Sequence, residues 1–107
     1  MPSTSARVVL CTFPNPEKAA EVARVLVEER LAACVNLTPP VRSIYAWKGA
    51  IEDDQETLAI IKTADARFEA LSKRIVELHP YEVPEVIALP IVEGHAPYLA
   101  WLLDNTR

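Results

Sequence analysis

The stretch 33–63, ACVNLTPPVRSIYAWKGAIEDDQETLAIIKT, predicts two strands joined by a short turn, and it decides how the chain folds. Its first part, residues 33–47, favours an extended chain, but Pro39 and Pro40 lie within it. Proline cannot donate a hydrogen bond to a neighbouring strand, so we expect a bend or a bulge there. After the turn Trp47-Lys48-Gly49-Ala50, a second long strand covers residues 51–63. The stretch therefore predicts a β-hairpin.

A strand and a helix are predicted before this hairpin. Residues 7–13, RVVLCTF, are apolar and β-branched, which is typical of a strand. Asn15 can cap the free backbone N–H groups of a helix, and Pro16 suits the first helical position. We expect this helix to continue to about Arg30. Residues 1–6 precede the strand and are predicted to be flexible.

A helix, a strand and a terminal helix are predicted after the hairpin. The side chain of Thr63 or Asp65 can cap the first helix, and Pro80 ends it. The strand covers residues 86–89, and the terminal helix covers residues 96–104. Apolar side chains at helical spacing predict the buried face of the first of these helices: Phe68, Leu71, Ile75 and Leu78.

The predicted order is β-α-β-β-α-β with an additional C-terminal helix, in a single domain that spans residues 1–107. This is the pattern of an α+β, ferredoxin-like sandwich. Right-handed crossovers place both main helices on one face of its antiparallel sheet. The other face of such a sheet usually meets water, and its strands then alternate polar and apolar residues.

The strands of this chain do not alternate. Residues 8–10 (VVL), 58–61 (LAII) and 86–89 (VIAL) are continuous apolar runs, which indicate strands that are buried on both faces. We therefore expect a homo-oligomer in which sheet packs against sheet. The alternative is that the terminal helix covers the second face.

Composition excludes several classes of site and partner. The chain has 107 residues and two glycines, Gly49 and Gly94, so it has neither a G-x-G-x-x-G motif nor a P-loop. A net charge of −4 without a basic stripe predicts that nucleic acid is not a partner. The longest apolar run has six residues, far fewer than the roughly 20 that span a bilayer, so no membrane partner is expected. Two cysteines, Cys11 and Cys34, without a secretion signal, predict a reduced, cytoplasmic protein.

Short motifs follow one another along the chain: Cys11-Thr12; 29–36, ERLAACVN; 43–49, SIYAWKG; 61–63, IKT; 79–85, HPYEVPE; and 98–101, YLAW. Together, from Arg7 onward, they resemble the CutA family, the divalent-cation tolerance proteins. The resemblance implies a ferredoxin-like subunit that assembles through its sheets as a tight homotrimer. It also implies a link to the tolerance of copper and other divalent cations.

His79 is the titratable residue with the most suggestive surroundings. It stands at the end of a predicted helix, where the negative end of the helix dipole favours its protonated form. Tyr81, Glu82 and Glu85 follow closely, and such a set suits either a divalent metal ion or an acid–base pair. The alternative is that His79 caps the helix and orders the loop.

The resemblance further implies that His79 and Cys11 are copper ligands. Thiolate and imidazole suit copper better than they suit magnesium or calcium. Some members of the family have a second histidine immediately before this one, but this chain has Leu78 there. The alternative for Cys11 is a small apolar residue with an inert thiol, buried in the sheet.

A second set of residues is predicted to line a cleft between subunits. Trp47 and Tyr81 would meet Lys62 and Glu85 there, and Lys62, ordered by an ion pair, would hold an anion. The alternative is that the aromatic side chains only pack the subunit interface. The acidic run 52–56, EDDQE, is expected to be a solvated hairpin end that protects the sheet edge, or else a weak cation surface.

Three functions are consistent with these residues. No catalytic motif of the G-x-S-x-G, H-E-x-x-H or C-x-x-C type occurs in the sequence. The first hypothesis rests on the family resemblance and on His79, Cys11 and the nearby carboxylates: a non-enzymatic, trimeric, cytoplasmic protein that binds copper or other divalent cations and contributes to metal tolerance. The second is a signalling or scaffold module like the trimeric PII regulators, with a small anionic ligand between subunits. The third is an enzyme that uses His79 and Glu85 as acid and base.

Overall fold

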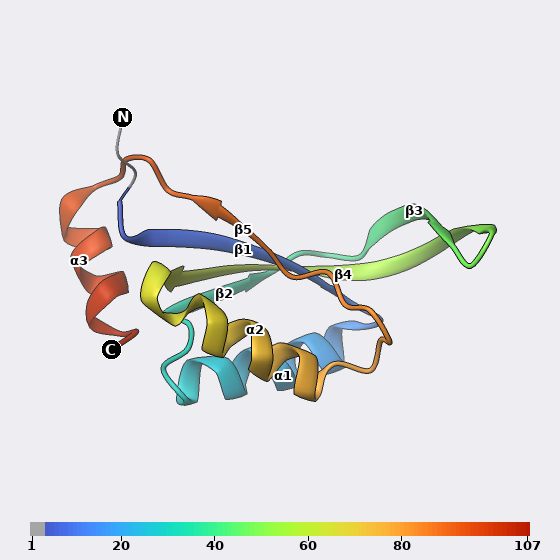
Figure 1. Ribbon diagram of the computed structural model, residues 1–107, viewed down its shortest axis with the longest axis horizontal. Coiled ribbons are helices and arrows are strands. Elements are labelled where there is room, and N and C mark those ends of the chain that lie inside the picture. Colours follow the sequence, from blue (N-terminus) through green and yellow to red (C-terminus); the bar gives the residue numbers. More distant parts are fainter. Residues whose placement is uncertain (1–3) are drawn as a thin grey trace.

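A computed structural model describes residues 4–107 of the chain. Within this range the fold is α+β, as predicted: one antiparallel sheet of five strands packs with three α-helices (Figure 1). The strands are β1 (Ala6–Phe13), β2 (Cys34–Leu37), β3 (Val41–Trp47), β4 (Ala50–Ala64) and β5 (Ile87–Pro90). The helices are α1 (Pro16–Glu28), α2 (Phe68–Leu78) and α3 (Ala96–Asp104), and a 3₁₀ turn, η1 (Asp65–Arg67), leads into α2.

The 15-residue strand β4 organises the sheet, because three other strands pair with it. The strand order is β2-β4-β1-β5, and β3 pairs with the first part of β4. All pairs are antiparallel. In the register, Cys11 lies opposite Ala59, Leu10 lies opposite Ile87, and Trp47 lies opposite Ala50.

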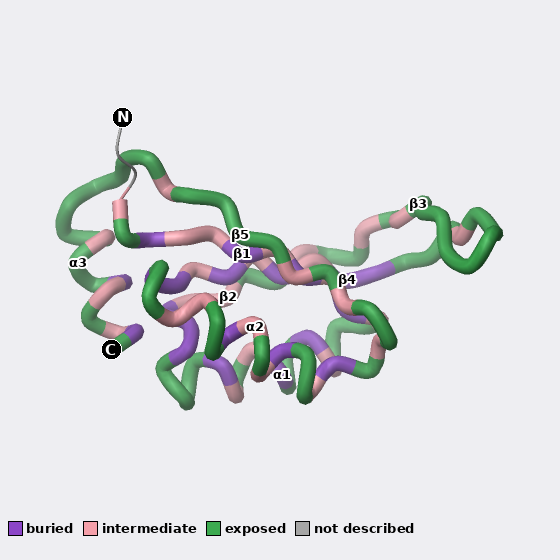
Figure 2. Tube along the Cα trace, viewed as in Figure 1, coloured by how far each residue is buried: buried purple, intermediate pink, exposed green. Residues whose placement is uncertain are grey.

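The β3–β4 hairpin extends beyond the rest of the molecule as an arm (Figure 1). As predicted, the chain leaves the sheet at Pro39 and Pro40, which separates β2 from β3. At the tip of the arm, Lys48 and Gly49 both have positive φ angles, 48° and 81°, as a type I′ turn requires. Most of the arm is exposed, whereas buried residues follow β1 and the later part of β4 (Figure 2).

The core lies between the sheet and the two main helices. α1 and α2 cover the same face of the sheet (Figure 1). The predicted face of α2 is confirmed, because Leu71 and Ile75 are fully buried and Phe68 and Leu78 pack against the same cluster. This core also contains the side chain of Cys11.

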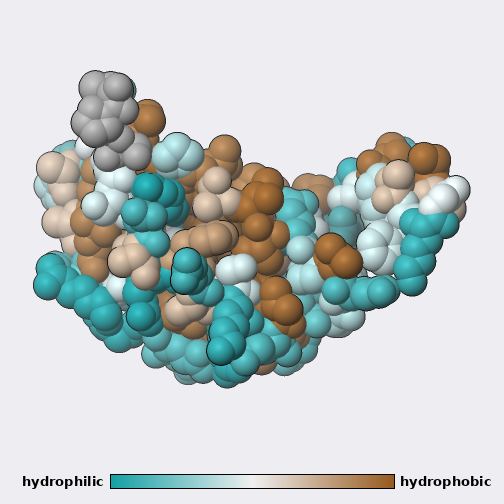
Figure 3. Space-filling model, in the orientation of Figure 1, coloured by the Kyte–Doolittle hydropathy of each residue, from teal (hydrophilic) through white to brown (hydrophobic). Residues whose placement is uncertain are grey.

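The opposite face of the sheet is apolar and partly open. Alternation along β1 places Val8 and Leu10 on this face, together with their partners Leu89 and Ile87 on β5. Ile87 is 51% exposed and Leu89 is 48% exposed. Hydrophobic residues gather over β5, whereas the surface over α1 and α2 is mainly hydrophilic (Figure 3).

The terminal helix α3 covers only one end of this open face. Its Leu102 is fully buried and clusters with Ala6 and Ala33. The side chains of β5 lie beyond this small cluster and stay exposed. The alternative prediction, in which the terminal helix covers the second face, therefore holds for that end alone.

The first helix is shorter than predicted. α1 ends at Glu28, and Arg30 adopts a positive φ angle of 60°. Its guanidinium then donates to the backbone carbonyls of Asp104 and Arg107, at 2.5 and 3.1 Å. This turn joins the end of α1 to the C-terminal residues.

The predicted cap of the second main helix is wrong. The Thr63 hydroxyl donates to the Leu31 carbonyl at 2.7 Å instead, and no side chain caps α2 or η1. Asp65 belongs to the 3₁₀ turn η1 that precedes α2. The 3₁₀ turn η1 therefore leads directly into α2, and no side-chain hydrogen bond caps the start of the helix.

The ends of the sheet also shift by one residue. β1 begins at Ala6, and the N–H and hydroxyl of Thr4 both donate to the Ile91 carbonyl, at 3.0 and 2.6 Å. Thr4 and Ala6 are thus held in place within the stretch that was predicted to be flexible, and residues 1–3 lie outside the described range. The last strand covers residues 87–90 rather than 86–89. None of the helices between residues 4 and 107 has the length and apolar character needed to cross a membrane.

Candidate functional site

His79 caps the end of α2 and ties the following loop to β1. Its backbone N–H donates to the Ile75 carbonyl at 2.8 Å, and its ring stacks on Phe13 with 4.6 Å between centroids. The Tyr81 backbone N–H donates to Nδ1 at 3.1 Å, so the ring proton must be on Nε2. Nε2 then donates to the Thr12 carbonyl at 2.7 Å. This is the capping role that was the alternative prediction.

The His79 ring is neutral in this setting. The side chain is buried, and desolvation lowers its pKa below the ordinary value of 6.5. The Thr12 carbonyl and the Glu56 carboxylate act in the opposite direction but are smaller influences. The prediction that the helix dipole favours the protonated ring is therefore wrong, because burial outweighs the dipole.

Cys11 is fully buried on the face of β1 that packs against α1 and α2. Burial raises the pKa of its thiol to about 12, and the carboxylates of Glu85 and Glu56 contribute to the same rise. Metal ions bind the thiolate rather than the thiol. The side chain is thus in the inert, apolar setting of the alternative prediction.

A copper ion would compete with existing contacts at His79 and Cys11 in this subunit. Both ring nitrogens of His79 are engaged in hydrogen bonds, and burial raises the pKa of the Cys11 thiol to about 12, so a metal ion would have to break a hydrogen bond and displace a proton from a buried thiol. Across residues 4–107, moreover, no three His, Cys, Asp or Glu side chains are placed to hold a metal ion together.

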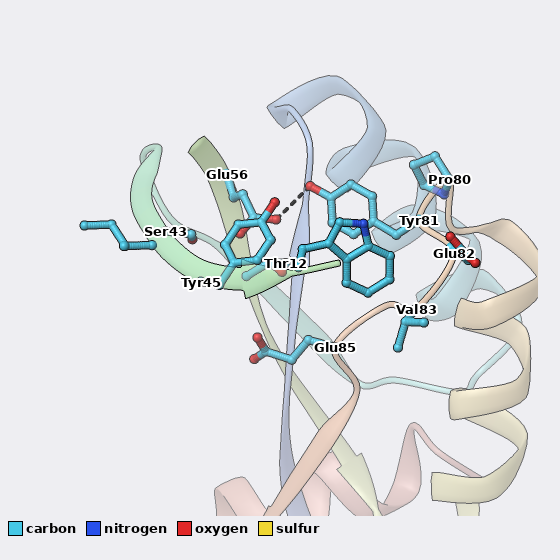
Figure 4. Close-up of a pocket in the computed structure, with 11 residues that line it drawn as sticks. Thr12, Ser43, Tyr45, Glu56, Pro80, Tyr81, Glu82, Val83 and Glu85 are labelled. Atoms are coloured by element: carbon cyan, nitrogen blue, oxygen red, sulfur yellow. Dashed lines mark hydrogen bonds between the residues drawn. The ribbon is translucent and has the colours of Figure 1, made fainter. Parts of the chain in front are cut away.

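A pocket of about 670 Å³ opens between the loop after His79 and the β3–β4 arm (Figure 4). Its walls are aromatic and acidic, so we call it the acidic pocket. β3, β4 and the loop supply the residues that matter here: Tyr45, Trp47, Glu56, Tyr81, Glu82 and Glu85. The pairing of β3 with β4 explains the shared face, because alternate residues of paired strands point to the same side.

Glu56 is the buried acid of this pocket, with 6% of the residue exposed. Its Oε2 accepts a hydrogen bond from the Tyr81 hydroxyl at 2.7 Å (Figure 4). Burial and this hydrogen bond raise the pKa of Tyr81 above its ordinary value of 10. Among residues 4–107, no hydrogen bond engages Oε1, and no lysine or arginine forms an ion pair with Glu56 or Glu85.

A second phenol–carboxylate pair lies further along the arm. The Tyr45 hydroxyl donates to Asp54 at 2.8 Å, and this hydrogen bond raises the pKa of Tyr45 to about 12. Both tyrosines therefore remain neutral and turn their hydroxyl groups toward carboxylates. Their rings stay available to line the pocket.

An ammonium group of the chain itself lies at the rim. Lys48 Nζ is 3.2 Å from a Glu82 carboxylate oxygen and 5.5 Å from the centroid of the Trp47 ring. A cation at this distance from an aromatic face is attracted by the ring. The rim thus already combines a carboxylate and an indole around one positive charge.

Comparison with known proteins identifies the family. The model of the CutA1 divalent ion tolerance protein family matches residues 7–105. The chain belongs to the CutA1 family. It is 54% identical over 99 residues to the divalent-cation tolerance protein CutA of Thermus thermophilus, covering 92% of this chain and 96% of that protein. A solved structure of the divalent cation tolerance protein Cut A1 from the same organism superposes with a TM-score of 0.93 at 52% identity, over 95% of this chain and 99% of that one.

A longer relative comes from an animal. This CutA1-family chain is 54% identical over 105 residues to protein CutA of Mus musculus, which covers 98% of this chain. The chain spans 58% of the length of that mouse protein. The role that the family name carries is the tolerance of divalent cations.

Within one subunit, the CutA1 fold brings together only some of the predicted metal ligands and only some of the predicted cleft residues. Trp47, Tyr81 and Glu85 meet in the acidic pocket, and Glu82 joins them. Lys62 lies outside the pocket, where its ammonium group donates to the side chain of Asn36. Neither His79 nor Cys11 lines the pocket.

Sequence reasoning missed one pocket residue of this CutA1-family chain, Glu56. Glu56 was grouped with a solvated acidic run, yet it is buried. A signal was present, because period-two alternation places Asp54 and Glu56 on one face of β4. Which face would become buried depended on the loop after α2, and the hairpin alone does not reveal that.

Proposed function

We propose that this chain is a non-enzymatic, cytoplasmic homotrimer that contributes to divalent-cation tolerance by binding cations weakly in the acidic pocket. The observation that carries the proposal is the pair of carboxylates, Glu56 and Glu85, which line an aromatic pocket without a cationic partner among residues 4–107. Glu56 is buried whereas Glu85 is exposed, so the cost of a buried carboxylate without a countercharge falls on Glu56, and a bound cation would offset that cost.

The homotrimer is supported by the open face of the sheet. The exposed side chains of Ile87 and Leu89 continue the apolar surface of Val8 and Leu10. A contiguous apolar face of this kind marks a site of association. We propose that ferredoxin-like subunits pack through this face, as the family resemblance implies. The two cysteines, which are free, are consistent with the cytoplasm.

Oxygen donors favour weak rather than tight metal binding. Carboxylates suit ions such as Mg²⁺ and Mn²⁺, and Mg²⁺ commonly keeps several waters beside one or two carboxylates. Glu56 and Glu85 supply such a set, and water would complete the coordination. Copper, the metal that the resemblance implies, would then bind as Cu(II) through oxygen. The pocket's charge also argues against a small anionic ligand, since its acidic residues would repel one.

Isothermal titration of the full chain with Mn(II), Zn(II) and Cu(II) tests the proposal. We expect weak, saturable binding that Glu85→Gln reduces roughly tenfold, in line with the loss of one supporting group at a metal site. Glu69→Gln, which alters an exposed glutamate on α2, is the matched control and should change nothing. Binding that is lost in His79→Gln or Cys11→Ser but kept in Glu85→Gln would instead support the copper ligands implied by the resemblance.

A further inference from the structure

The acidic pocket has more room and more aromatic surface than a metal ion requires. Its volume of about 670 Å³ lies in the range of pockets for small organic molecules. Residues 4–107 provide no group of three metal-ligating side chains, so a divalent ion bound in the pocket would keep most of its water and leave the aromatic surface unused. We propose that the pocket binds an organic ammonium ion, a small molecule that carries a protonated or quaternary amine.

The carboxylates provide the negative charge that such a cation needs. Glu56 is more than nine-tenths buried, and its Oε1 lacks a hydrogen-bond donor among the described residues. Tyr81 holds the other oxygen, which fixes the direction of the carboxylate (Figure 4). Glu85 reaches toward the arm from the loop and has no ion pair within residues 4–107.

The aromatic residues supply the ring faces that an ammonium ion would contact. Tyr45 and Trp47 line the pocket from β3, and Tyr81 lines it from the loop. Because both tyrosine hydroxyls donate to carboxylates, the rings are held by their edges. Ammonium groups are attracted to aromatic faces, and quaternary ones lose little hydration on entry.

The chain itself provides an example of this recognition at the rim. The Lys48 ammonium group lies against the Trp47 ring and pairs with Glu82, at 5.5 and 3.2 Å. Both Lys48 and Glu82 are largely exposed, so this contact is shallow. The deeper part of the pocket repeats the same chemistry with Tyr81 and Glu56 but contains no lysine or arginine among its lining residues.

The test is an NMR titration of the full chain with tetramethylammonium chloride, followed on the backbone amides of residues 79–86. Sodium chloride at equal ionic strength and tert-butanol, a neutral molecule of similar size, are the controls. We expect saturable shifts with tetramethylammonium alone. Trp47→Leu should weaken binding about tenfold, within the range of a cation–π contact. Trp101→Leu alters the chain's other, similarly exposed tryptophan and should have no effect.

Glu56→Gln provides a second variant, which should weaken tetramethylammonium binding several-fold while it preserves the side-chain volume. Equal shifts with tert-butanol, or unchanged binding in both Trp47→Leu and Glu56→Gln, would overturn the inference. So would an absence of saturable shifts, which is expected if a side chain of a second copy fills the pocket.

This inference rests on the proposed function only in treating the pocket as a cation site. Manganese binding depends on carboxylates and not on the indole, so Trp47→Leu should leave the Mn(II) titration unchanged. Failure of the metal titrations would contradict the proposed function alone, and failure of the tetramethylammonium titration would contradict this inference alone.

Discussion

The Tyr81 hydroxyl donates a hydrogen bond to the Glu56 carboxylate at 2.7 Å, and this contact joins the loop after α2 to the base of the β3–β4 arm. The two residues are 25 positions apart in the sequence. His79 holds the start of the same loop through Thr12 and the Tyr81 backbone. Together these contacts place Tyr81, and with it one wall of the acidic pocket.

Replacing Tyr81 should destabilise the fold, because it leaves a buried carboxylate without its donor. We expect Tyr81→Phe to lower the free energy of unfolding by about 1–3 kcal/mol, the usual cost of such a loss. Urea unfolding, followed by circular dichroism, measures this change in the free energy of unfolding. Tyr45→Phe removes a similar contact on the exposed arm and should cost clearly less. Equal losses in the two variants would show that the buried position of Glu56 does not matter.

The neutral state of His79 should make stability depend on pH. Burial lowers the pKa of the folded ring below 6.5, so the unfolded chain binds more protons as the pH falls through this region. This contribution to stability is therefore complete above about pH 6.5 and is lost as the pH falls through the lowered pKa of the folded ring. The free energy of unfolding, measured between pH 7.5 and 5.5, should fall more steeply with decreasing pH in the wild type than in His79→Gln. Parallel curves would contradict a neutral, buried His79.

The Cys11 thiol should be almost unreactive in the folded protein. In a Cys34→Ser variant Cys11 is the only cysteine, and its pKa of about 12 leaves a very small thiolate fraction. We expect labelling with a disulfide reagent at pH 8 to be on the order of a thousandfold slower than for an ordinary thiol. The same chain in denaturant should react at once, which serves as the control. Rapid labelling of the native variant would show that the thiol is accessible.

The open face of the sheet should control assembly. Ile87→Asp places a charge on this face, and we expect it to shift the molecular mass in solution from three subunits toward one subunit of 11.9 kDa. Val76→Asp is the matched control, because Val76 is 54% exposed on α2, away from this face. Analytical ultracentrifugation distinguishes the species. A trimer that survives Ile87→Asp would mean that another surface holds the subunits together.

Local patterns were enough to predict most of the elements. The proline pair at 39–40 and the glycine at the tip of the arm act through the backbone of their own neighbours, so their effects could be predicted directly. The buried face of α2 followed from helical spacing in the same way. These features depend on residues that are close in sequence.

The site could be predicted only in part, because its properties depend on contacts between distant segments. The charge of His79 is set by burial against Phe13 and β1, which outweighs the local helix dipole. Glu56 is buried and accepts a hydrogen bond from Tyr81, which is 25 residues away in the sequence. The cleft that was predicted for Lys62 lies between subunits; within one subunit, its ammonium group donates to the side chain of Asn36. The spacing of residues along the chain contains little information about such long-range contacts.

The most direct test of a cation site made of carboxylates is the electron paramagnetic resonance spectrum of Cu(II) bound below one equivalent. The measurement uses the His95→Ala variant, in which His79 is the only imidazole. We predict oxygen ligation, without superhyperfine coupling to an imidazole nitrogen, and a weaker bound signal when Glu85→Gln is added. Imidazole nitrogen coupling that disappears on adding His79→Gln would contradict the account and assign the copper to His79.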